Sequence, residues 1–128
     1  MIEFVSVDMF INTVVIASGI DIREFDLLYY DNHTKFTDEE YRLIANDIKN
    51  ENSCAGMTMQ LDCGNIFVFI RKGHERRDLT VIHELHHAAN KLLQRAGVNH
   101  DGDDETYAYL TAWLVNEYYN RLDDYEKK

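Results

Sequence analysis

The segment from Asp78 to Gly97 constrains the fold of this 128-residue chain most strongly. Its apolar residues recur at spacings of three and four, which places them along one side of a helix. These residues are Ile82, Leu85, Ala89, Leu92 and Ala96. Asp78 or Thr80 suits the N-cap and Gly97 suits the stop. We therefore predict a helix that ends near Arg95 and packs its apolar side against a sheet.

Within this helix, His83, Glu84 and His87 form the pattern H-E-x-x-H. Residues four apart lie one turn apart on the same side of a helix, so both imidazoles reach a single ion. The pattern is typical of zinc-dependent hydrolases, in which the glutamate takes a proton from water and does not bind the metal. It predicts a Zn²⁺ site with Glu84 as general base. The alternative is a histidine-rich, solvated helix. His86 points away from His87 and is predicted to be a surface residue or a neighbour of the ligands.

A catalytic zinc needs a third protein ligand and an open position for water. Glu105 begins a second predicted helix that extends to about Leu122, and it heads a stripe with regular spacing. The stripe consists of Glu105, Ala108, Ala112, Val115 and Tyr119. We expect this stripe to face the small side chains of Ala88 and Ala89 and to bring Glu105 to the histidines. Acidic residues are also favoured in a first helical turn by the helix dipole. The other candidates for the third ligand are Asp104, Asp101 and His100.

A zinc hydrolase usually adds a hydrogen-bond donor for the developing oxyanion. Tyr109, Tyr107 and His100 are the candidates for this role. For each tyrosine, packing in the core or at its rim is the alternative.

The rest of the chain predicts one domain, residues 1–128, of the α+β class. Three short runs of β-branched and other apolar residues predict a small mixed or antiparallel sheet of about three strands packed on the metal-binding helix. They are Thr13–Ser18, followed by Gly19, and the hairpin strands Met57–Leu61 and Ile66–Ile70. Met1–Asp8 is predicted to be a further strand or an extended arm. Helices are expected at Ile22–Tyr30, capped by Asp21, and at Asp38–Lys49, after the capping box of Thr37 and Glu40.

The charge balance disfavours nucleic acid and membranes as partners. The chain has 13 Lys and Arg against 23 Asp and Glu, a formal net charge of −10. Binding to phosphate-rich surfaces requires a basic face. The one basic run, Arg71 to Arg77, is expected to be a solvated loop. No apolar run is long enough to span a bilayer and no signal peptide is evident, so we expect a cytoplasmic location. Cys54 and Cys63 allow one disulfide, but free thiols fit a reducing compartment better.

Three stretches of the sequence carry a family likeness: HELHHAAN at 83–90, Gly97-Val98, and DDETYAYL at 103–110. Together they resemble small zincin-like metallopeptidases of the gluzincin type that bacteriophages and prophages encode. The resemblance implies a minimal zincin fold in which a C-terminal helix supplies the third ligand. It implies that His83, His87 and Glu105 bind zinc and that Glu84 is the base. A phage-encoded protein of this kind acts in the bacterial host cytoplasm. By analogy with zincins, a peptide substrate would add to the sheet edge formed by one hairpin strand.

Two further functions are compatible with the same residues. One is a catalytically silent zincin-fold phage structural protein or host-factor-binding protein in which the zinc is structural. The other is a zinc hydrolase of non-peptide amides. Of the three functions, we expect a metallopeptidase that acts on a protein or peptide substrate.

Overall fold

The computed structural model describes residues 1–7, 10–99 and 104–128. Within these ranges the strands are β1 (Ile2–Ser6), β2 (Thr13–Ser18), β3 (Gly56–Gln60) and β4 (Ile66–Ile70). The helices are α1 (Ile22–Asp31), the 3₁₀ turn η1 (His33–Lys35), α2 (Asp38–Lys49), α3 (Asp78–Arg95) and α4 (Asp104–Glu126). None of the helices in the described ranges is both long and apolar enough to cross a membrane.

The strands form one mixed sheet in the order β1-β2-β4-β3. β1 and β2 are antiparallel, β2 and β4 are parallel, and β4 and β3 are antiparallel. The predicted hairpin and the strand before Gly19 are confirmed. The N-terminal segment is a strand rather than an arm, so the sheet has four strands instead of about three. Consequently β1 and β3 are the edge strands and β4 is central.

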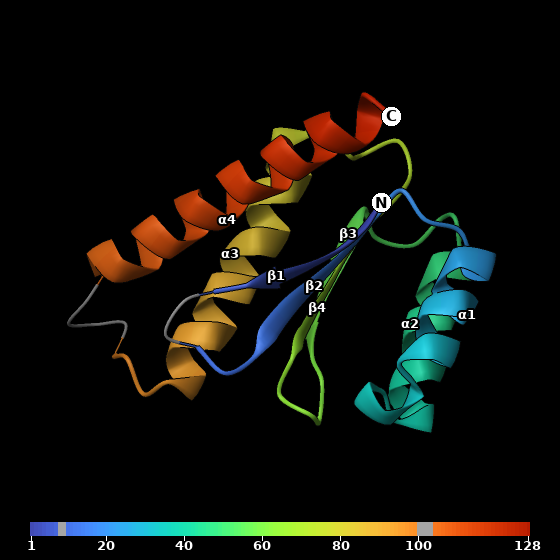
Figure 1. The fold of residues 1–128 in the computed structure, drawn as a ribbon, viewed down its shortest axis with the longest axis horizontal. Coiled ribbons are helices and arrows are strands. Elements are labelled where there is room, and N and C mark those ends of the chain that lie inside the picture. The colour runs from blue at the N-terminus through green and yellow to red at the C-terminus, as the bar shows by residue number, and fades with distance from the viewer. Residues whose placement is uncertain (8–9, 100–103) are drawn as a thin grey trace.

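Helices cover both faces of the sheet, with α1 and α2 on one side and α3 and α4 on the other (Figure 1). Alternate residues of β2 serve the two cores: Val14 and Ile16 pack toward α3 and α4, whereas Val15 and Ala17 pack toward α1 and α2. All residues of β4 are buried, as expected for a central strand covered on both faces. The α+β class and the packing of α3 on the sheet are confirmed.

Local capping explains the bounds of the helices. Asp21 accepts a hydrogen bond from the Glu24 backbone N–H at 2.9 Å, and Thr37 accepts one from Glu40 at 3.1 Å. Both are reciprocal capping boxes, as the sequence predicts. At the end of α3, Gly97 has φ 82°, the left-handed conformation that stops a helix.

The predicted cap of α3 is wrong. The N-cap residue is Arg77, which makes no side-chain cap hydrogen bond, and Asp78 is already helical. The Asp78 carboxylate instead accepts a hydrogen bond from the Tyr119 hydroxyl at 2.5 Å. This side chain therefore links α3 to α4.

The predicted buried side of α3 is correct at its centre and wrong at two residues. Leu85, Ala89 and Leu92 are buried, but Ile82 is 47% exposed and Ala96 is exposed. The core positions also include Val81, Ala88 and Leu93. The stripe is thus rotated toward Val81 and Ala88, because the helix packs on the sheet and on α4 at once.

The predicted stripe on α4 is also wrong. Glu105, Ala108 and Ala112 are exposed. The helix instead buries larger residues, namely Tyr107, Leu114, Tyr118 and Leu122. These side chains remove much more apolar surface from water than alanines do, so they determine which side of the helix faces the core. α4 also extends beyond the predicted end near Leu122, where Asp123 and Glu126 pair with Arg76 at 2.6 and 2.9 Å.

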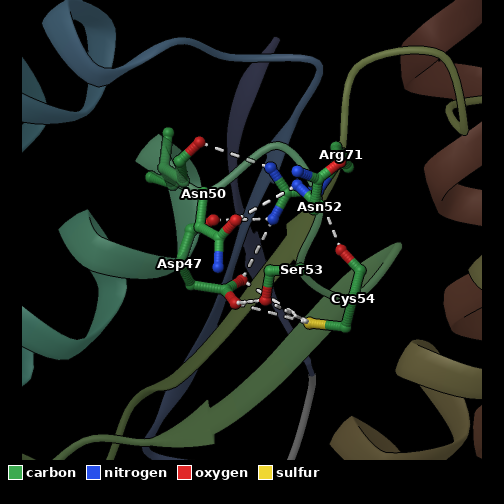
Figure 2. Close-up of polar contacts among 7 residues, drawn as sticks. Asp47, Asn50, Asn52, Ser53, Cys54 and Arg71 are labelled. Carbon is green, nitrogen blue, oxygen red and sulfur yellow. Dashed lines mark hydrogen bonds and ion pairs between the residues drawn. The ribbon is translucent and has the colours of Figure 1, made fainter.

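The basic run before α3 is not simply a solvated loop. The Arg71 side chain is only 12% exposed and donates hydrogen bonds to the carbonyl oxygens of Asp47, Ile48 and Cys54. Figure 2 shows this guanidinium joining the end of α2 to the loop that leads into β3. Arg71 is therefore a structural residue. Both cysteines, Cys54 and Cys63, are exposed free thiols.

Candidate metal centre

His83 and His87 project from the same side of α3, and both are exposed. Their Nε2 atoms lie 3.2 Å apart, and their rings are perpendicular with centroids 4.6 Å apart. Two nitrogens that each bind a tetrahedral zinc at about 2.0–2.1 Å are separated by about 3.3 Å. The observed separation therefore fits two ligands of one zinc ion. The same distance also fits a hydrogen bond in which one ring donates to the other.

The opposite side of α3 anchors this pair to the sheet. Val81, Leu85 and Ala88 are fully buried in the core beneath the helix. A helix held in this way limits the movement of the backbone that carries the imidazoles. The packing of the domain thus holds the helical turn from which both histidines project.

Glu84 lies between the histidines and the edge strand β3. The residue is only 7% exposed. Its Oε1 accepts a hydrogen bond from the Thr58 hydroxyl at 2.8 Å, and its Oε2 lies 3.9 Å from His83 Nε2. The carboxylate is therefore held beside His83.

Glu105 is not brought to the histidines by a buried stripe, because it is exposed in the first turn of α4. Among the described residues, no three His, Cys, Asp or Glu side chains converge as a metal-binding group. Of the other candidates, Asp104 lines a groove between α3 and α4, while His100 and Asp101 lie outside the described residues. The identity of the third ligand stays a prediction.

His86 faces α4 and not the other two histidines. Its Nδ1 lies 3.3 Å from the Thr111 hydroxyl, and its Nε2 lies 3.3 Å from the Asn90 side-chain nitrogen. It also lines the groove of about 790 Å³ between α3 and α4. His86 is exposed, as predicted for a surface residue.

The predicted oxyanion donors lie in different surroundings. Tyr107 is 2% exposed and donates a hydrogen bond to the Val98 carbonyl at 2.8 Å. Tyr109 is 73% exposed and lines a separate hollow with Trp113. His100 lies outside the described residues. A role for any of them at an oxyanion stays a prediction.

Thr58 and Gly56 are site residues that the sequence reasoning missed. They lie two apart on β3, so both face α3, where they contact Glu84. Met57 and Met59, between and after them, pack on the other face of the sheet. The alternation of small or hydroxyl residues with large apolar ones in β3 indicates two different faces, but only the three-dimensional structure shows that Glu84 lies against the first.

The chain matches no protein-family model, and no curated protein or solved structure matches it.

Proposed function

We propose that the protein is a zinc-dependent peptidase that hydrolyses peptide bonds in an extended segment of a protein or peptide. One observation carries the proposal: the His83 and His87 Nε2 atoms lie 3.2 Å apart, with the Glu84 carboxylate 3.9 Å from the first of them. Two nitrogen donors at zinc spacing, with an acidic side chain next to them, are the core of a metal-assisted hydrolase.

Each residue has a defined task. His83 and His87 would hold the Zn²⁺ ion, which would lower the pKa of bound water and polarise a carbonyl group. Glu84 Oε2 accepts a proton from the attacking water as the water oxygen bonds to the carbonyl carbon. Glu84 then gives this proton to the amide nitrogen as the C–N bond breaks, which releases a carboxylic acid and an amine.

A comparison with Glu40, the other buried acidic residue described, supports this role for Glu84. The Glu40 oxygens accept hydrogen bonds from the backbone N–H groups of Thr37 and Asp62, so this carboxylate has a structural task. At Glu84, one oxygen is held by Thr58 and the other lies toward His83. A buried carboxylate of this kind costs desolvation energy, and a catalytic task is a reason to retain it.

The sheet edge supports the choice of an extended substrate. β3 is an edge strand and lies next to α3, whereas β4 has a neighbour on each side. Only β3 of the two hairpin strands therefore has an edge to which a peptide strand can add. A peptide bound there would pass beside the residues of α3 that hold the metal.

Replacing Glu84 by Gln tests the proposal, because the amide keeps the shape of the side chain but cannot act as a base. We expect the variant to keep its zinc and to lose at least about 100-fold in the cleavage of a fluorogenic peptide library. Glu39→Gln, on the exposed surface of α2, is the matched control and should cleave like the wild type.

A different set of results would reject the proposal that the protein is an enzyme. If the wild type bound stoichiometric zinc but cleaved no library peptide, the peptidase proposal would fail. If, in addition, His83→Ala lowered the melting temperature while Glu84→Gln changed nothing, the metal would be structural. That result is the one expected of a catalytically silent zincin-fold protein.

A further inference from the structure

The edge strand β3 holds Glu84 through a single hydroxyl group. Thr58 Oγ1 lies 2.8 Å from Glu84 Oε1 and 2.9 Å from the Glu84 carbonyl oxygen. One hydroxyl proton serves one of these acceptors at a time, and both lie on the same turn of α3. Thr58 is paired with Val68 in the sheet, and its β-branched side chain has few rotamers. The hydroxyl oxygen is therefore held within hydrogen-bond distance of the carboxylate.

Gly56 provides the space for the same side chain. A Cβ atom at this position would lie 2.8 Å from Glu84 Cγ, 3.3 Å from Glu84 Cδ and 2.9 Å from the Phe69 carbonyl oxygen. The strand cannot move away easily, because Gly56 is paired with Ile70. Gly56 is also not among the glycines with positive φ, so the backbone does not require a glycine here. What requires glycine is the close approach of both the Glu84 side chain and the Phe69 carbonyl oxygen.

We propose that Thr58 and Gly56, here called the Glu84 seat, position the Glu84 carboxylate for proton transfer. The seat holds Oε1, so that Oε2 lies toward His83. Thr58 acts through Glu84 and is a positioning residue, not a catalytic one. The inference rests on the proposed function, because a seat of this kind matters for rate only if Glu84 is the base.

Three substitutions separate the hydroxyl group from the shape of the residue. Thr58→Val keeps the branched shape and removes the donor, whereas Thr58→Ser keeps the donor. Thr13→Val is the matched control, because it makes the same change on β2, on the face shared with Val15 and Ala17, which pack toward α1 and α2 and not toward α3. The substrate is the library peptide that the wild type cleaves fastest, and zinc content and melting temperature are measured for every variant.

We expect Thr58→Val to bind zinc like the wild type and to lose between about 10- and 100-fold in kcat, with KM within about twofold. Thr58→Ser should recover most of this loss, and Thr13→Val should show none. Gly56→Ala should also lower kcat, because its methyl group meets both Glu84 Cγ and the Phe69 carbonyl oxygen and so changes the position of Glu84 relative to β3. A merely structural link between β3 and α3 would change melting temperature without this split between kcat and KM.

A measurement on the metal-free protein tests the contact without any turnover. With ¹³C-labelled glutamate, the Glu84 carboxyl signal is identified as the one that Glu84→Gln removes. Thr58→Val should shift this signal, and Thr13→Val should not.

Several results would overturn the seat. They are an unchanged Glu84 signal in Thr58→Val, an unchanged kcat in that variant, or an equal loss of kcat in Thr58→Ser. Failure of the proposed function is distinguishable, because then the wild type itself cleaves no peptide, whatever the variants do. If Thr58→Val shifted the Glu84 signal but the wild type cleaved no peptide, Thr58 would be a structural contact, and its positioning role would be overturned.

Discussion

Arg71→Met should destabilise the protein by about 3 kcal/mol, because it removes the guanidinium that joins α2 to the loop before β3. The guanidinium donates to the carbonyl oxygens of Asp47 and Cys54 at 2.6 and 2.8 Å, and more weakly to Ile48 at 3.3 Å. Hydrogen bonds from charged groups contribute about 1.5–3 kcal/mol each, so the two short ones give about 3–6 kcal/mol. The lower end applies, because water can reach part of the exposed loop after the substitution.

Methionine also lacks the cation–π attraction of the guanidinium, whose carbon lies 5.2 Å from the centre of the Phe69 ring. Urea unfolding followed by far-UV circular dichroism measures the loss. The free energy of unfolding falls with urea concentration at about 1.5 kcal/mol per molar, so a destabilisation of about 3 kcal/mol lowers the urea midpoint by about 2 M. Lys72→Met is the control, because Lys72 is exposed, and it should shift the midpoint little. A midpoint for Arg71→Met within about 0.3 M of the wild type would refute the reasoning.

The backbone N–H groups of Thr37 and Asp62 each donate to a different oxygen of Glu40. In Glu40→Gln one of these oxygens becomes an NH₂ group, so one of the two N–H groups loses its acceptor. The free energy of unfolding in urea should fall by about 2 kcal/mol, whereas the exposed Glu39→Gln should change it by less than about 0.5 kcal/mol. Equal effects of the two would contradict the structural role of Glu40. Burial raises the pKa of Tyr118 to about 12, above the value of about 10 in the unfolded chain. The resulting stabilisation is complete below about pH 10 and is lost as the pH rises to about 12. Urea midpoints over this range should fall less steeply in Tyr118→Phe, and an identical fall would contradict the assigned pKa.

Much of the fold is predictable from the sequence where local chemistry decides it. Asp21 and Thr37 cap α1 and α2 through their own neighbours, and Gly19 and Gly97 end elements by their backbone freedom. These signals act over a few residues, so no knowledge of the tertiary structure is needed. The hairpin between β3 and β4 is predictable for the same reason.

The orientation of α4 is not predictable in this way. Its apolar residues are distributed around the helix, so the stripe of Ala108 and Ala112 and the stripe of Leu114 and Tyr118 both satisfy helical periodicity. Only packing against α3 and the sheet selects the larger side chains. Arg71 is a similar case, because a buried arginine and a solvated one have the same local sequence.

In the candidate site, too, local features are predictable from the sequence and non-local contacts are not. The spacing of His83 and His87 is a property of one helical turn, and the distance between their nitrogens agrees with it. Thr58 belongs to a strand 26 positions away from Glu84, so no local pattern joins the two. A third ligand would require a non-local contact too, and the spacing along α4 alone does not establish such a contact for Glu105.

The zinc content of the purified protein tests the central claim most directly. After exposure to zinc and removal of excess metal, mass spectrometry should find about one zinc per chain in the wild type. His83→Ala and His87→Ala should lose most of it, whereas His86→Ala, on the same helix but directed at α4, should retain it. A wild type without zinc, or equal zinc in all three variants, would contradict a metal site at His83 and His87.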